Sequence, residues 1–103
     1  MKLRTREEIV IGQLRAGDEI TAKAFQKMLR RFDEDDEMFG TYHGRLIRSL
    51  YITDTEKHIW KIAVENNASD RSLYRYRKEY LGWIEFYRRK LASRSEAAAS
   101  SDN

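Results

Sequence analysis

The sequence predicts an all-α protein that folds as a single domain, and three observations lead to this prediction. The 103 residues include no proline and only five glycines, so helices can run long with few interruptions. Apolar side chains recur every three or four residues, which is the spacing of one helix face. A content of 41% hydrophobic and 36% charged residues suits a small core with a charged surface. We expect about five helices within residues 1–92 and a disordered tail over residues 93–103.

The first helix is expected over about residues 6–16. Thr5 followed by Glu8 forms a capping-box pattern, in which the threonine hydroxyl and the glutamate satisfy the first backbone amides. Gly17 can adopt the left-handed conformation that ends a helix. Three apolar residues are expected to be buried in this helix: Ile9, Val10 and Leu14.

A second helix is expected to start between residues 18 and 21 and to end near the acidic run at residues 33–37. One apolar stripe defines it: Ile20, Ala24, Phe25, Met28, Leu29 and Phe32. The acidic run itself is expected to be a solvated loop. A metal site is the alternative, but the run lacks the spaced oxygen ligands and central glycine of a calcium loop. The run could also act as a screen that keeps this side of the protein off DNA.

The two glycines of residues 38–44 extend the predicted loop, in which His43 is expected to be exposed. A third helix follows over about residues 45–51, with four buried residues: Leu46, Ile47, Leu50 and Tyr51. Thr53 and Glu56 form a second capping-box pattern, which predicts the start of a fourth helix directly after it.

Residues 59–76 are expected to form a helix, a tight turn and a second helix. Asn67 can take the left-handed conformation that ends the first of these helices, and Ser69 can cap the second. Ala63 is small enough for the two helices to approach closely. The predicted core of this motif consists of five residues: Ile62, Ala63, Asn67, Leu73 and Tyr76.

This segment resembles the helix-turn-helix family of DNA-binding modules, in which the second helix enters the major groove. Where many members have glycine at the turn, this chain has Asn67. The run SDRSLYRYRK at residues 69–78 is similar to the recognition helices of phage-type transcriptional regulators with a sigma region-4-like module. The resemblance places the motif at about residues 54–78 and implies double-stranded DNA as the partner.

The last helix is expected to run from Asp70 to about Ala92, and it is basic. Residues 69–94 carry eight basic and three acidic residues in a chain whose net charge is only +3. The resemblance implies contacts to bases or to the groove for Ser69, Arg71, Tyr74 and Arg75. It implies contacts to phosphates for Lys78, Arg88 and Arg89. The alternative is a solvated surface with ion pairs such as Arg75–Glu79.

The C-terminal half of this helix has more aromatic surface than recognition requires, in Trp83, Phe86 and Tyr87. These residues either pack on the N-terminal helices or form an oligomer or partner surface, because an apolar stripe has the same pattern in both cases.

The function expected from the sequence is sequence-specific DNA binding by a transcriptional regulator of phage or mobile-element type. A homodimer is expected because one recognition helix covers only a half-site, and the transcription machinery is a further candidate partner. The alternatives are a small DNA-packaging subunit that forms rings, and a helical protein-interaction module.

Other classes of function lack their residue patterns. The chain has no glycine-rich phosphate loop, no cysteine and no cluster of histidines and carboxylates, so neither catalysis nor a metal or cofactor is expected. No apolar run suits a membrane span or a signal peptide, and a cytoplasmic location is therefore expected.

Overall fold

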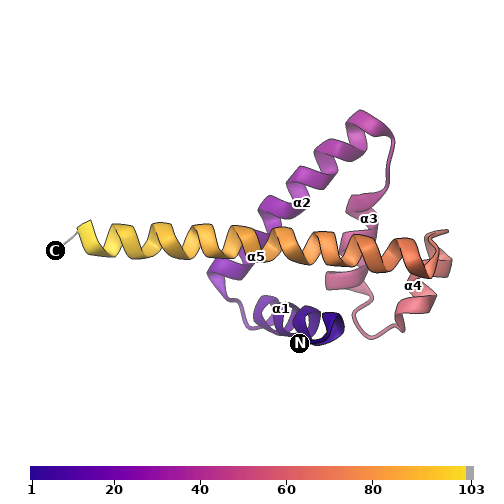
Figure 1. Ribbon diagram of the computed structural model, residues 1–103, viewed down its shortest axis with the longest axis horizontal. Coiled ribbons are helices and arrows are strands. Elements are labelled where there is room, and N and C mark those ends of the chain that lie inside the picture. The colour runs from indigo at the N-terminus through magenta and orange to yellow at the C-terminus, as the bar shows by residue number, and fades with distance from the viewer. Residues whose placement is uncertain (102–103) are drawn as a thin grey trace.

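The protein is all-helical, as predicted. The computed structural model describes the backbone of residues 1–101 and the side chains of residues 1–94. The elements, in order, are α1 (Leu3–Arg15), α2 (Glu19–Phe39), α3 (His43–Arg48), a π-helical segment (Ser49–Thr53), α4 (Ile59–Glu65) and α5 (Asp70–Ser101). Helix α2 crosses the long α5, α1 lies against the same part of α5, and α3 and α4 gather near the start of α5 (Figure 1).

The core forms where α2 crosses α5. Tyr80, Leu81 and Ile84 of α5 are fully buried there, and the ring of Phe32 meets the edge of Tyr80 at a centroid distance of 4.9 Å. Helices α1, α3 and α4 and the π-helical segment each add residues to the same cluster: Val10, Ile11, Leu46, Ile47, Leu50, Tyr51, Ile62 and Ala63. One continuous core therefore joins all the helices.

Helix α1 differs from the prediction in its start and in its buried face. It begins at Leu3, so Thr5 lies inside the helix and does not cap it. Ile9 is 43% exposed, whereas Glu7 is fully buried. The buried stripe includes a carboxylate, so the spacing of apolar residues alone does not give its register. Its residues are Glu7, Val10, Ile11 and Leu14. Gly17 has a φ of +78° and follows the end of the helix as predicted.

Helix α2 starts where it was expected, because the Asp18 carboxylate accepts a hydrogen bond from the backbone N–H of Thr21 at 2.9 Å. The prediction of its end was wrong. The helix continues through the whole acidic run to Phe39 and stops at Gly40, which has a φ of +67°. The run is therefore helical and not a loop.

The acidic run is helical because two of its carboxylates bind the next helix. Asp36 accepts hydrogen bonds from the Thr41 hydroxyl at 2.6 Å and from the backbone N–H groups of His43 at 2.8 Å and Gly44 at 2.7 Å. It thereby caps the N-terminus of α3. Burial raises the pKa of Asp36, but these three hydrogen bonds together lower the pKa by more, to below its usual value. Asp33 pairs with Arg48 through two hydrogen bonds of 3.1 and 2.9 Å.

Gly44 lies directly under this carboxylate network. A Cβ atom at this position would lie 2.1 Å from Oδ1 of Asp33 and 2.8 Å from Nη1 of Arg48. We expect Gly44→Ala to lower the free energy of unfolding by about 1–3 kcal/mol, because the ion pair and the cap must move to admit the methyl group. Urea unfolding followed by circular dichroism measures the change.

Gly82 provides the matched control for this substitution. It lies in the exposed part of α5, and a Cβ atom there would meet nothing within 4 Å. We expect Gly82→Ala to raise the free energy of unfolding by about 0.5–1 kcal/mol, since alanine is the better helix former. Equal effects of the two substitutions would contradict the close packing at Gly44.

The region between α2 and α4 also differs from the prediction. Helix α3 already begins at His43, and α4 begins at Ile59 without a side-chain cap, so the second capping box does not open it. Asp54 from that box instead closes the π-helical segment, where it accepts a hydrogen bond from the Ser49 hydroxyl at 2.5 Å. The four residues predicted to be buried in the third helix are buried.

His43 is a packing residue and not an exposed loop residue. Its Nδ1 lies 2.5 Å from the hydroxyl oxygen of Tyr80, and its ring meets those of Phe32 and Tyr76, each at a centroid distance of 5.2 Å. Burial raises the pKa of Tyr80 above its usual value, so its hydroxyl stays protonated.

Helix α5 passes the end near Ala92 that the sequence predicts. Ser93 and Arg94 belong to the helix, which extends to Ser101. Residues 93 and 94, which the sequence analysis assigns to a disordered tail, thus continue the helix. The rest of that predicted tail, from residue 95 onward, lies outside the residues whose side chains are described.

Candidate nucleic-acid interface

The turn between α4 and α5 has the conformation that the sequence predicts. Asn67 has a φ of +53°, in the left-handed region. The N–H of Ala68 donates to the carbonyl of Ala63 at 2.9 Å, and the N–H of Asn67 donates to the carbonyl of Val64 at 3.2 Å. This pair of hydrogen bonds is the Schellman motif, which closes the end of α4. The Ser69 hydroxyl then accepts from the backbone N–H of Ser72 at 3.1 Å and caps α5.

The structure also brings together the apolar residues of the predicted motif. Ile62, Ala63 and Leu73 are each at most 1% exposed and belong to the common core. Tyr76 is half-buried and packs against His43. Arg45 of α3 donates to the carbonyl of Glu65 at 3.2 Å, which ties the end of α4 to the body. The start of α5 is thus packed against the common core and joined to α4 by the turn.

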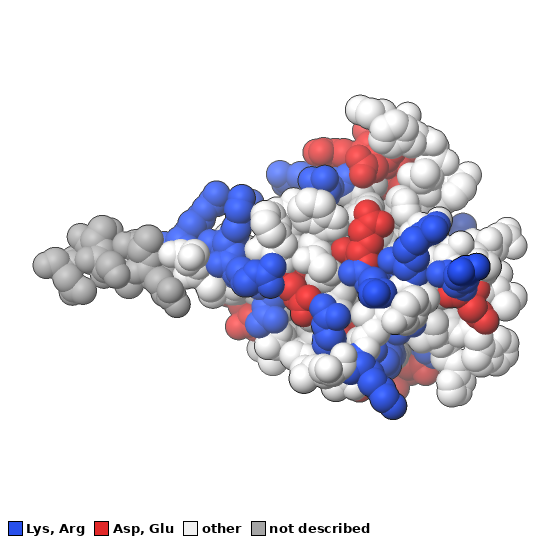
Figure 2. All heavy atoms as spheres, viewed as in Figure 1, with Lys and Arg blue, Asp and Glu red and all other residues white. Residues whose placement is uncertain are grey.

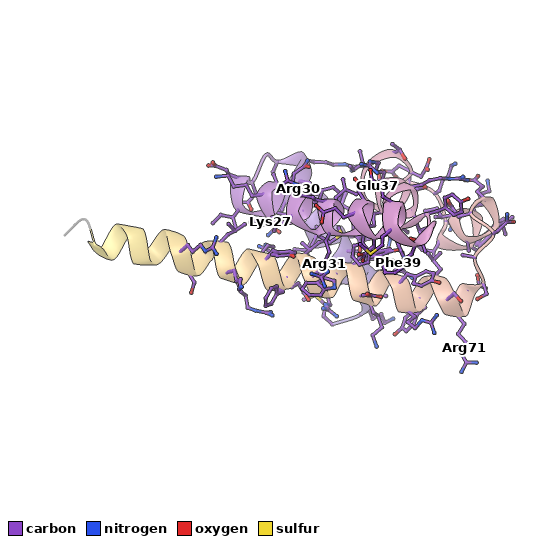
Figure 3. The ribbon with its side chains drawn as sticks, turned by 90° about the horizontal axis from the view of Figure 1, so that it is seen from above. Lys27, Arg30, Arg31, Glu37, Phe39 and Arg71 are labelled. Atoms are coloured by element: carbon purple, nitrogen blue, oxygen red, sulfur yellow. The ribbon has the colours of Figure 1, made fainter. Side chains whose placement is uncertain are left out.

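The opposite face of the first turns of α5 is open to solvent. Arg71, Tyr74, Arg75 and Lys78 are all exposed, and Figure 3 shows Arg71 pointing away from the body. Among the residues whose side chains are described, none of the three cations has a carboxylate within 4 Å, and the predicted alternative of an Arg75–Glu79 ion pair is not formed. Lys78 lies 5.5 Å from the ring centre of Tyr74. This face therefore presents two guanidinium groups, an ammonium group and a phenol within two helical turns.

Two of the predicted phosphate contacts lie elsewhere. Arg88 is half-buried, and its Nε atom is covered by protein. Arg88 also lies seventeen residues after Arg71, about 26 Å along the helix. Arg89 is exposed but lies eighteen residues after Arg71, about 27 Å along the helix. Only Lys78 of the three lies beside the residues that are predicted to contact bases.

Sequence reasoning missed that Arg77 does not belong to the basic surface. Arg77 is 7% exposed and forms an ion pair with the fully buried Glu7 of α1. Glu7 also accepts a hydrogen bond from the Tyr51 hydroxyl at 3.2 Å. Burial raises the pKa of Tyr51 well above its usual value, and the charge of Glu7 raises it further. The pair connects α1 to α5 directly behind the exposed basic face.

The aromatic residues later in α5 serve mainly to pack the helix. Trp83 and Tyr87 are half-buried against the core, and the guanidinium of Arg31 from α2 lies 3.9 Å from the centre of the Trp83 ring. Phe86 is 36% exposed. Of the two alternatives, packing against the N-terminal helices accounts for Trp83 and Tyr87.

Helix α4 contributes an exposed surface that the sequence did not single out. Trp60 is 56% exposed and Val64 is 67% exposed, one turn apart on the outer side of the helix. The Nζ atom of Lys61 lies 6.0 Å from the centre of the Trp60 ring. The sequence does indicate this exposure, because Trp60 and Val64 lie outside the helical spacing of the buried residues of α4.

Comparison of the chain with models of known protein families, with curated proteins and with solved structures found no match. Within the described part of the chain, no three histidine, cysteine, aspartate or glutamate side chains are grouped so as to hold a metal ion. In the same residues, no helix combines the length and the apolar character needed to span a bilayer.

Proposed function

We propose that this protein binds double-stranded DNA sequence-specifically through the exposed face of the first turns of α5. One observation carries the proposal. Arg71, Arg75 and Lys78 project from a helix whose start is fixed by the left-handed turn at Asn67, and no carboxylate among the described residues neutralises them. By contrast, an ordinary solvent-exposed helix face carries charges of both signs, and residues three or four positions apart form ion pairs with one another.

The chemistry of this face suits the major groove. The groove is about 12 Å wide and admits one α-helix. An arginine can donate two parallel hydrogen bonds to O6 and N7 of guanine, which favours base reading by Arg71 and Arg75. Ser69 and Tyr74 carry hydroxyls suited to phosphates or base edges, and Lys78 is suited to a phosphate. Asp70 lies in the first turn, where its negative charge favours the positive end of the helix dipole.

The proposal includes transcriptional regulation as a homodimer. One recognition helix reads only a half-site, and a two-fold dimer gives the usual gain in affinity and specificity. The assignment to regulators of the phage or mobile-element type rests on the resemblance of residues 69–78. The transcription machinery would be the second partner of such a regulator.

The test is the dependence of DNA binding on salt concentration. Each phosphate contact contributes about −0.9 to the slope of log K against log salt, so the phosphate contact assigned to Lys78 predicts a slope of about −1 per protomer. Fluorescence anisotropy with a random duplex and with a duplex selected from a random pool, over a salt series, measures the slope and the preference. No binding at about 50 mM salt, where phosphate contacts are strongest, would refute the proposal.

A further inference from the structure

The charges on the outer side of α2 change sign near Phe32. Lys27 and Arg30 precede this residue, Glu34 and Glu37 follow it, and all four charged side chains are exposed. At 100° per residue these four residues form one stripe opposite the buried face. Figure 2 shows basic atoms nearer the crossing with α5 and acidic atoms nearer the free end of α2, and Figure 3 labels three of the four residues along the helix.

Within the part of the chain whose side chains are described, these four charges have no ion-pair partner. The salt bridges of α2 are those of Lys23 with Glu19 and of Asp33 with Arg48. Among the residues whose side chains are described, no opposite charge lies within 4 Å of the four residues of the stripe. The stripe is therefore free to pair with an external surface.

We propose that a second copy of this chain docks on this stripe, with the two α2 helices antiparallel about a two-fold axis that passes near residue 32. Position 32 lies midway between Lys27 and Glu37, and also midway between Arg30 and Glu34. In the antiparallel arrangement each basic residue thus lies at the same level as an acidic residue of the partner copy. A two-fold axis forms each of these contacts twice.

A groove of about 610 Å³ opens over the same stripe, and all four stripe residues line it together with Lys23, Asp33 and Arg48. The apolar part of its lining is small and comes from Ala22 and Leu29. The contact with the partner copy is therefore expected to be mainly electrostatic and to weaken as salt is added.

The charge pattern also fixes the orientation. Parallel helices in register would place Lys27 against Lys27 and Glu37 against Glu37, which is repulsive. The surface lies on α2, whereas the proposed DNA-binding face lies on α5, so this inference does not rest on the proposed function. Its test involves no DNA, so it can fail while DNA binding by α5 holds, whereas a monomeric wild type would also contradict the homodimer of the proposed function.

A charge-exchange experiment tests the pairing. The variant K27E/R30E has an entirely acidic stripe, and E34K/E37K has an entirely basic one. Analytical ultracentrifugation of the wild type at about 100 μM and low salt is expected to show a species of twice the 12.3 kDa chain mass that dissociates as salt is added. Each variant alone is expected to be monomeric, and an equimolar mixture of the two is expected to recover the double-mass species.

The control is K90E/R94E, which makes the same change in net charge at two exposed residues of α5. It is expected to associate as the wild type does, and circular dichroism checks that all variants keep their helix content. Three results would each overturn the proposal: a monomeric wild type at 100 μM and low salt, wild-type association by either stripe variant alone, or no recovery in the mixture.

Discussion

Replacing Arg71 and Arg75 with alanine is expected to remove the preference of this protein for its selected DNA site. A bidentate contact between arginine and guanine favours the correct base over a wrong one by about 1–3 kcal/mol. Each substitution should therefore weaken binding to the selected site roughly five- to 150-fold. Binding to random duplex should fall much less, because the nonspecific contribution of Lys78 remains. The measurement is anisotropy on selected and random duplexes at one salt concentration.

Arg94→Ala provides the control for loss of charge. Arg94 is exposed on the same helix but lies 23 residues after Arg71, about 35 Å along the axis. The substitution Arg94→Ala should therefore leave the ratio of specific to nonspecific affinity unchanged. If Arg71→Ala and Arg94→Ala weaken binding equally on both duplexes, α5 acts only as a diffuse positive surface, and base reading by this helix is excluded.

The largest effect on stability is expected from the buried ion pair between Glu7 and Arg77. Arg77→Met leaves the buried carboxylate of Glu7 with only the Tyr51 hydroxyl and the more distant Arg4, whose Nη1 lies 3.9 Å away. Breaking a buried ion pair in this way costs about 3–5 kcal/mol. Glu7→Leu should cost less, because the long Arg77 side chain can turn its charged end toward water. The free energies of unfolding come from urea denaturation at neutral pH.

The double variant E7L/R77M should recover most of the loss of the single variants, since no buried charge then remains. Arg6 and Glu85 provide a matched comparison. They join the same two helices with the same chemistry, but their side chains are about one-third exposed, at 35% and 32%. Glu85→Gln is expected to cost at most about 1 kcal/mol. Equal costs at the two pairs would contradict the argument from burial.

The sequence by itself determined the helical class of the protein and the turn between α4 and α5. Each of these features depends on residues only a few positions apart. The apolar spacing of α2 determines which face is buried, Asn67 provides the left-handed turn, and the hydroxyl of Ser69 reaches an amide three residues away. Local sterics and hydrogen bonds act in the same way whatever surrounds them. The exposed face of Arg71 and Arg75 also follows from this periodicity.

Only the tertiary structure decided which polar residues lie inside. Glu7 and Arg77 are seventy residues apart, and although each lies on the buried stripe of its own helix, nothing nearby in the sequence shows that its partner is present. His43 joins the core through Tyr80, 37 residues later. The acidic run is helical because Asp36 accepts hydrogen bonds from the backbone amides at the start of α3. A buried polar group is tolerated only when its partner is present, and such partners come from distant segments that the fold brings into contact.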